Sequence, residues 1–167
     1  DILGGAGKAA LDLAAAGGVQ VADAAAIAAN AMALFGIAGK DAAHAMDLIA
    51  GFANATTGSV TDFKFALAAS GAVARLAGQT FDQTAVALSL MGKAGILGSD
   101  AGTSLKTMLN NLIPTTDRAK NVFKELRLEF VRADGSFKDL RDIAGELNQA
   151  TRDLTEAERS LALETIF

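Results

Sequence analysis

Cysteine, tryptophan and tyrosine are absent from the chain, and histidine and proline each occur once. Without cysteine, disulfides, zinc–thiolate sites, iron–sulfur clusters and thiol catalysis are excluded. A single histidine also removes the usual metal-binding and general-base constellations, so we expect no metal and no cofactor. The apolar residues are largely alanine, and together with the lone proline this composition predicts an all-α fold.

Basic residues are few as well, because 15 Lys and Arg stand against 19 Asp and Glu and give a formal net charge of -4. This balance argues against nucleic-acid binding, which needs a basic surface. The longest uncharged stretch is residues 24–39, whereas a membrane-spanning helix needs roughly 18 or more strongly apolar residues. We therefore predict no transmembrane helix. The N-terminus has neither a signal-peptide pattern nor an initiator methionine, so the chain is expected to be a piece of a longer protein.

The composition changes abruptly at Pro114. The residues up to Pro114 contain 31 alanines, 14 charged residues and no glutamate, whereas the residues after it contain 6 alanines, 20 charged residues and all six glutamates. This change predicts two parts. The first is an Ala-rich helical bundle over residues 1–114, and the second is a charged helix–β-hairpin–helix subdomain over residues 115–167.

Glycines and capping patterns divide the Ala-rich part into helices. The predicted helices cover residues 3–16, 20–35, 41–55, 59–77, 80–93 and 100–113. Ser59 with Asp62, and Thr80 with Gln83, have the spacing of capping boxes. Since alanine buries little area, larger side chains must anchor the bundle. The predicted anchors are Phe35, Phe52, Phe63, Phe65, Leu67, Phe81, Leu88 and Leu105.

Residues 20–42 and 79–101 form an internal repeat, because a shift of 59 residues makes ten of the 23 positions identical, and only three of the ten are alanine. The repeated unit is a helical hairpin with a Gly-Ile-x-Gly turn. The turn glycines are Gly36 and Gly39 in the first copy and Gly95 and Gly98 in the second. The first glycine of each turn suits a left-handed helix C-cap. We predict two related hairpins packed on each other, with both of these glycines at positive φ.

The charged part has an amphipathic helix pattern before residue 127, followed by a strand-like segment at residues 128–132. Asp134 and Gly135 then form a strong two-residue turn signal, so we predict one small β-hairpin here. Ser136 and Asp139 are predicted to cap the next helix. Thr155 and Glu158 have the capping-box spacing for the last helix.

His44 is the first candidate for a chemical role, with Asp41 and Asp47 each three residues away on the same helical face. No nucleophile accompanies it in sequence, so we predict a surface histidine with acidic neighbours. Residues 92–99 contain glycines and a lysine but not in the order of a phosphate-binding loop, and they are interpreted as a helix C-cap.

Three further patterns are weak. Asp134 and Ser136 resemble part of a calcium loop but lack the closing glutamate. Asp139 and Asp142 share a helical face and are interpreted as a solvated face. No glutamate precedes residue 125, which disfavours a wall hydrolase with a carboxylate in an apolar pocket. We therefore predict that the chain is not an enzyme.

Several blocks of the sequence resemble the core region of phage tail tape measure proteins. The most specific block is residues 93–109, and residues 10–18, 29–36, 130–137 and 154–159 resemble other parts of the family. Residues 69–74 depart from it, since relatives often carry an aromatic residue and a proline there. The resemblance implies a structural virion protein of a long-tailed phage or prophage. It also implies a place in the tail lumen or at the tail tip, and in the host cytoplasm during assembly.

The resemblance further implies action in tail length determination and genome ejection. The implied partners are other tape measure copies, tail tube and tail tip proteins, and tail assembly chaperones. Because glycines interrupt the helices, we expect a compact docking and self-association module. The extended helix that measures tail length is then expected to lie elsewhere in the protein. The alternative is a membrane-active helical translocator that aids DNA passage and contacts membrane only at ejection, which the mean hydropathy of +0.31 favours.

Overall fold

The computed structural model describes residues 2–167, with side chains from residue 6 onward. The described residues form nine α-helices and one short 3₁₀ helix, so the predicted all-α class is confirmed for this part of the chain. They divide into two compact units, residues 1–106 and residues 107–167. The change in composition at Pro114 lies inside the second unit, and the division of the chain at Pro114 stays a prediction.

Helices of 13 to 17 residues build the first unit. They are α1 (Ile2–Gly17), α2 (Val21–Phe35), α3 (Ala42–Ala55), α4 (Val60–Leu76), α5 (Phe81–Lys93) and the beginning of α6 (Gly98–Asn110). The 3₁₀ helix Gly39–Asp41 precedes α3. The predicted capping boxes are present at the starts of α4 and α5, where each capping hydroxyl accepts a hydrogen bond from the backbone N–H three residues on.

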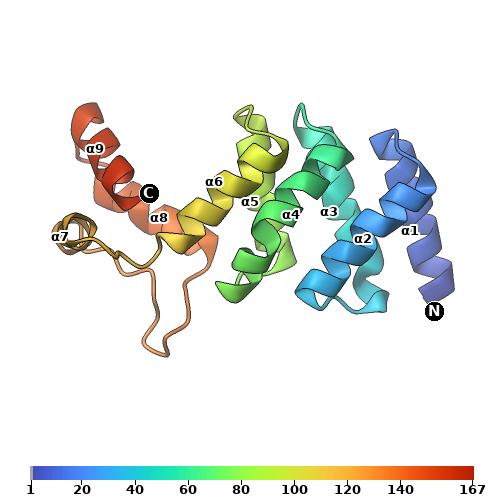
Figure 1. Cartoon of the computed structure of the whole chain (residues 1–167), viewed down its shortest axis with the longest axis horizontal. Coiled ribbons are helices and arrows are strands. Elements are labelled where there is room, and N and C mark those ends of the chain that lie inside the picture. The colour runs from blue at the N-terminus through green and yellow to red at the C-terminus, as the bar shows by residue number, and fades with distance from the viewer. Residues whose placement is uncertain (1) are drawn as a thin grey trace. The chain divides into compact units, whose positions relative to one another are not determined.

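The helices of the first unit lie in two layers (Figure 1). In one layer α3 contacts both α1 and α5, and in the other α2 contacts α4. Each of α1 to α4 also contacts the next helix along the chain, so the backbone alternates between the layers. The alternation follows from the short glycine-containing turns, which reverse the chain after each helix.

Small residues allow the helices within a layer to approach closely. A Cβ on Gly102 of α6 would collide with the carbonyl oxygen of Ala66 and lie 2.7 Å from the Cβ of Ala69, both on α4. A Cβ on Gly71 of α4 would collide with the side chain of Leu34 on α2. The glycines of this sequence therefore act inside helices as well as at turns.

Phenylalanines form the centre of the first unit. The ring of Phe63 meets those of Phe52 and Phe81 edge-to-face, with centroids 5.3 Å and 6.2 Å away, and Phe35 meets Phe81 at 5.5 Å. The predicted anchor Phe65 is wrong, because it is 51% exposed. Two residues apart on a helix are roughly 200° apart around its axis, so Phe63 and Phe65 cannot both face the core.

The second unit contains three further helices, α7 (Asp117–Glu125), α8 (Leu140–Thr151) and α9 (Glu156–Ile166). α7 contacts α9, and the rings of Phe123 and Phe130 meet edge-to-face with centroids 5.0 Å apart. The predicted capping box of Thr155 and Glu158 is present at α9. Asp139 occupies the N-cap position of α8 without a side-chain cap bond, and Ser136 bonds Asp134 instead.

The predicted β-hairpin around Asp134 and Gly135 is wrong, because the described residues contain no β-strand. The chain does reverse there, with Gly135 at φ 86 and a single isolated antiparallel bridge between Val131 and Phe137. Leu128 and Phe130 are buried and Glu129 between them is exposed, so this segment has the alternating burial of a strand. A two-stranded ribbon is marginal without a third strand, and this loop is instead tied to α8 by its side chains.

Candidate functional site

A shallow pocket of about 470 Å³ lies where the turn after α2 meets the turn before α5. Its apolar lining comes from Phe35, Ile37 and Phe81, and its polar lining includes Asp41, His44, Arg75, Gln79, Thr80 and Asp82. All of these residues belong to the first unit. The pocket thus lies between the end of the first copy of the sequence repeat and the beginning of the second.

His44 pairs with a residue that its neighbourhood in sequence did not suggest. Its Nε2 lies 2.9 Å from Oδ2 of Asp82 on α5, and both side chains are more than half exposed. The hydrogen bond with Asp82 raises the pKa of His44, with smaller contributions from Asp47 and Asp41. Sequence reasoning missed Asp82 because only the packing of α3 on α5 brings the two residues together.

The His44–Asp82 pair offers little scope for catalysis. Thr80 is the hydroxyl residue lining the pocket, and its oxygen accepts the hydrogen bond of the α5 capping box from Gln83. Among the residues that line the pocket, no hydrogen bond joins this hydroxyl to His44. The pair can link α3 to α5 by a charge-assisted hydrogen bond when His44 is protonated.

We expect the imidazole of His44 to titrate above 6.5, and Asp82→Asn to bring its pKa back toward that value. Because the folded pKa is raised, the pair stabilises the fold below the unfolded pKa near 6.5, and this contribution is lost as pH rises through the folded pKa. Proton NMR titration measures the pKa of His44 without ambiguity, since the chain has one histidine. Asp41→Asn is the control, and an equal or larger shift there would contradict the assignment.

The two repeat turns share their first glycine conformation. Gly36 has φ 68 and Gly95 has φ 83, and the residue after each donates its N–H back to a methionine carbonyl, Ile37 to Met32 and Ile96 to Met91, at 2.9 Å in both cases. The second glycines differ in role, since Gly39 begins the 3₁₀ helix and Gly98, at φ 55, begins α6. Superposition of the whole hairpins stays a prediction.

Replacing Gly95 with valine is expected to lower the free energy of unfolding by roughly 1 kcal/mol or more, because a β-branched residue is strained in the left-handed region. No heavy atom would lie within 4 Å of the new Cβ, so the effect isolates backbone strain. Urea denaturation measures the change. Gly7→Ala, at an open helical position, is the control, and equal stability of the two variants would contradict the prediction.

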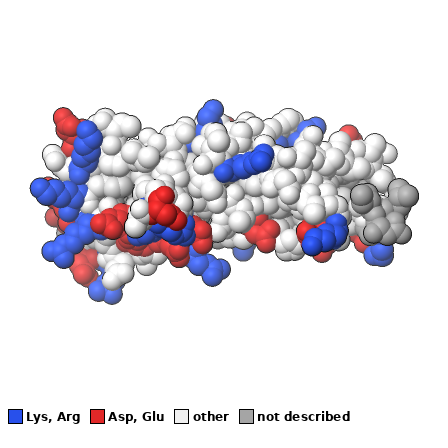
Figure 2. Space-filling view, turned by 90° about the horizontal axis from the view of Figure 1, so that it is seen from below, with Lys and Arg blue, Asp and Glu red and all other residues white. Residues whose placement is uncertain are grey.

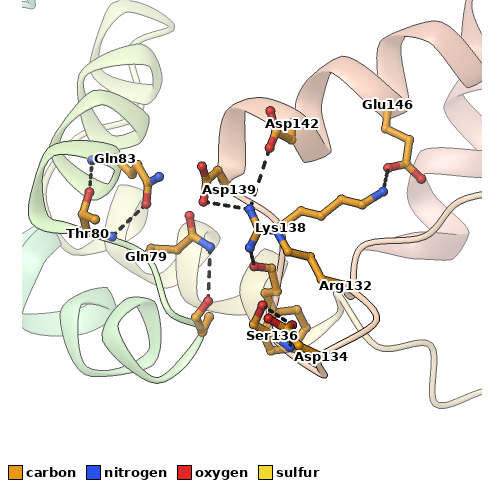
Figure 3. A network of polar contacts seen from close by, with 12 residues as sticks. Gln79, Thr80, Gln83, Arg132, Asp134, Ser136, Lys138, Asp139, Asp142 and Glu146 are labelled. Atoms are coloured by element: carbon orange, nitrogen blue, oxygen red, sulfur yellow. Dashed lines mark hydrogen bonds and ion pairs between the residues drawn. The ribbon is translucent and has the colours of Figure 1, made fainter.

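In the second unit, basic side chains of the loop bind carboxylates of α8 (Figure 3). Arg132 lies between Asp139 and Asp142, at 3.3 Å and 3.9 Å, and also donates to the carbonyl oxygen of Phe137. Lys138 binds Glu146 at 2.7 Å. These ion pairs make Asp139 and Asp142 part of the attachment of the loop.

The tip of this loop is an Asx-type turn. Asp134 Oδ1 accepts hydrogen bonds from the N–H and the hydroxyl of Ser136, and these bonds lower the pKa of the Asp134 carboxyl. Within the described residues, no group of three or more His, Cys, Asp or Glu side chains could hold a metal ion. Asp134 and Ser136, the residues that resemble part of a calcium loop, are hydrogen-bonded to each other.

Residues 92–99 end α5 and begin α6, and they do not connect a strand to a helix. Among the described helices, none is by itself long and apolar enough to cross a membrane. One pair, residues 6–17 and 21–35, reaches the required length and composition together but is bent by 114°.

Exposed apolar side chains are the more distinctive surface feature of the first unit. Large ones are Leu11, Val21, Phe65, Leu76, Val86, Leu90 and Ile96. Figure 2 shows charged side chains gathered on the second unit, whereas the visible face of the first unit carries few. Exposed apolar side chains favour binding to other apolar surfaces.

Comparison with known proteins bears on what this surface serves. The sequence matches the family described as phage-related minor tail protein over residues 1–167. The chain belongs to this family. Membership of this family supports a structural role in a phage tail and a location in the tail of the virion.

Two relatives of this chain are described as a tape measure protein and a probable tape measure protein, so the resemblance found in the sequence is confirmed. The chain is 33% identical over 157 residues to the tape measure protein of Pneumococcus phage Dp-1, covering 94% of this chain and 14% of the relative. It is 27% identical over 135 residues to the probable tape measure protein of Escherichia phage P2, covering 80% of this chain and 17% of the relative. The chain thus spans a small part of the relatives' length. No solved structure matches it.

Proposed function

We propose that this chain is a folded docking and self-association module of a tape measure protein. Through that module the protein acts in tail assembly, length determination and genome ejection. The observation that carries the proposal is the set of large apolar side chains left exposed on several helices of the first unit, of which Leu76 at 85% and Leu90 at 62% are the most exposed. Such side chains favour binding to another apolar surface.

The extended helix that sets tail length lies outside these residues. An α-helix adds ~1.5 Å per residue only where it runs on without folding back. Here the longest helix has 17 residues, and the chain reverses after it. The module therefore contributes little length for its residue count and serves to hold the long protein to its partners.

The partners are other tape measure copies, tail tube and tail tip proteins, and tail assembly chaperones. The module lies in the tail lumen or at the tail tip, and in the host cytoplasm during assembly. The net charge of -4 supports protein rather than nucleic-acid partners.

Light scattering over a dilution series of the 167-residue chain tests the proposal. The mass is expected to rise above the monomer value of 17.0 kDa with concentration. Binding of the chain to purified tail tube and tail tip proteins is measured beside it. A chain that stays monomeric at high concentration and binds none of these proteins would refute the proposal.

A second candidate function is membrane translocation, which the bent pair formed by residues 6–17 and 21–35 favours. In the fold, the apolar sides of this pair are buried, with Leu13 and Ile27 at 1% and 3% exposure. Insertion would require both helices to leave α3 and α4. Leakage of dye from liposomes by the chain would support translocation, and intact liposomes would leave the docking function.

A further inference from the structure

One side of α5 carries an exposed row of two apolar and two charged residues. Its members recur every three or four residues and so share one side of the helix; they are Asp82, Val86, Leu90 and Lys93, hereafter the α5 row. Val86 is 54% exposed and Leu90 is 62% exposed. Leu88, two residues from each of them, is fully buried on the other side of the helix.

The sequence repeat shows how the corresponding side of α2 is used. The shift of 59 residues aligns the α5 row with Asp23, Ile27, Ala31 and Leu34 of α2. Ile27 and Ala31 are buried, and Leu34 lies against Gly71 of α4. In the first copy of the repeat a helix therefore packs on this side, whereas in the second copy the two apolar residues of the α5 row are exposed.

The charges of the α5 row stand symmetrically about its apolar pair. Asp82 lies about one turn before Val86, and Lys93 lies about one turn after Leu90. When two such rows are laid antiparallel, Val86 of each faces Leu90 of the other, and Asp82 of each faces Lys93 of the other. Laid parallel, the rows would bring like charges together. The α5 row is thus complementary to itself in the antiparallel orientation.

Asp82 is able to make this contact while it is bonded to His44. Only its Oδ2 lies at 2.9 Å from the imidazole, and the side chain is 56% exposed. The two oxygens of a carboxylate offer about four lone-pair sites. The ammonium group of Lys93 from a second copy therefore finds acceptor capacity on Asp82 with the bond to His44 in place.

We propose that α5 of one copy of this chain packs antiparallel against α5 of a second copy through the α5 row. The inference rests on the self-association proposed above and names the surface and the orientation that carry it. The contact is isologous, because both copies contribute the same residues, and it closes at two copies. A single pair of helices buries little area, so this contact belongs with the weak, transient interfaces.

Light scattering of the parent chain at rising concentration is expected to show a mass that levels off at twice the monomer value of 17.0 kDa. A mass that climbs steadily past this plateau would contradict a closed contact between two copies.

A substitution at the centre of the α5 row tests the surface. Leu90→Glu is expected to weaken dimerisation by about tenfold or more in sedimentation velocity, because the changed residue enters the contact twice and places a charge against Val86. Leu76→Glu, at a residue 85% exposed on α4, is the matched control and is expected to dimerise as the parent does. Circular dichroism verifies that both variants stay helical.

A charge exchange tests the antiparallel orientation. Asp82→Lys and Lys93→Asp alone are each expected to weaken dimerisation several-fold, because each places like charges at both ends of the contact. The variant that carries both substitutions restores opposite charges at both ends and is expected to dimerise nearly as the parent does. His44→Asn is the control for the lost bond to Asp82 and is expected to leave dimerisation unchanged. No recovery in the double variant would overturn the inference.

The failure of this inference is separable from that of the proposed function. If the parent chain associates and Leu90→Glu leaves that association unchanged, the α5–α5 contact is wrong and self-association stands. If the parent chain is monomeric at the highest concentration at which it stays soluble, both self-association and the contact are refuted.

Discussion

Replacing Phe63 with alanine is expected to lower the free energy of unfolding by about 3–5 kcal/mol, the usual cost of emptying a buried phenylalanine site. The side chain is fully buried, and its ring meets both Phe52 and Phe81 edge-to-face. Many of the buried residues of this core are alanines, whose short side chains cannot fill the space left behind. Urea denaturation followed by circular dichroism measures the loss.

Phe65→Ala is the matched control for this change, because it removes the same side chain from the same helix. Phe65 is 51% exposed, so we expect its replacement to change the free energy of unfolding by about 0.5 kcal/mol or less. Losses of similar size in the two variants would contradict the assignment of Phe63 to the core and of Phe65 to the surface.

Replacing Gly102 with alanine is expected to destabilise the first unit by about 1–3 kcal/mol, although alanine is the better helix former. The added methyl group would meet the carbonyl oxygen of Ala66, which is part of the α4 backbone and cannot rotate away. Relief requires α6 and α4 to move apart. The expected readout is a lower urea midpoint with an unchanged slope.

Gly51→Ala is expected to change the free energy of unfolding in the opposite direction to Gly102→Ala. Gly51 lies within α3, and a Cβ there would have no heavy atom within 4 Å. We expect this variant to be stabilised by up to about 1 kcal/mol, because alanine restricts the unfolded chain and favours the helix. If Gly102→Ala were stabilising like Gly51→Ala, the close packing of α6 on α4 would be refuted.

Local signals in the sequence located most helix boundaries, because these signals act within a few residues. The capping boxes that begin α4, α5 and α9 each involve a hydroxyl and a side chain three residues on, and both are legible in the sequence. The same holds for the turns at Gly36 and Gly95, where a glycine followed by isoleucine ends a helix. Such contacts need no knowledge of what packs against the helix.

The sequence-based predictions were wrong where a local pattern was compatible with two structures. In the alanine-rich sequence of α4, either Phe63 or Phe65 could face the core, and only the position of α3 and α5 around α4 selects Phe63. The sequence of residues 128–132 and the turn signal at Asp134 and Gly135 predicted a hairpin, but Arg132 and Lys138 bind carboxylates of α8 and hold the loop without a sheet.

By itself, the sequence determined the helical class, the capping of the helices and the family to which this chain belongs. These properties depend on composition and on residues close together in the chain. Only the tertiary structure decided which residues meet across it, such as His44 with Asp82, and which apolar side chains of α4 and α9 stay at the surface. The physical reason is that alanine gives every side of a helix a similar apolar character, so the facing of each helix depends on the few large side chains and the glycines that its neighbours accommodate.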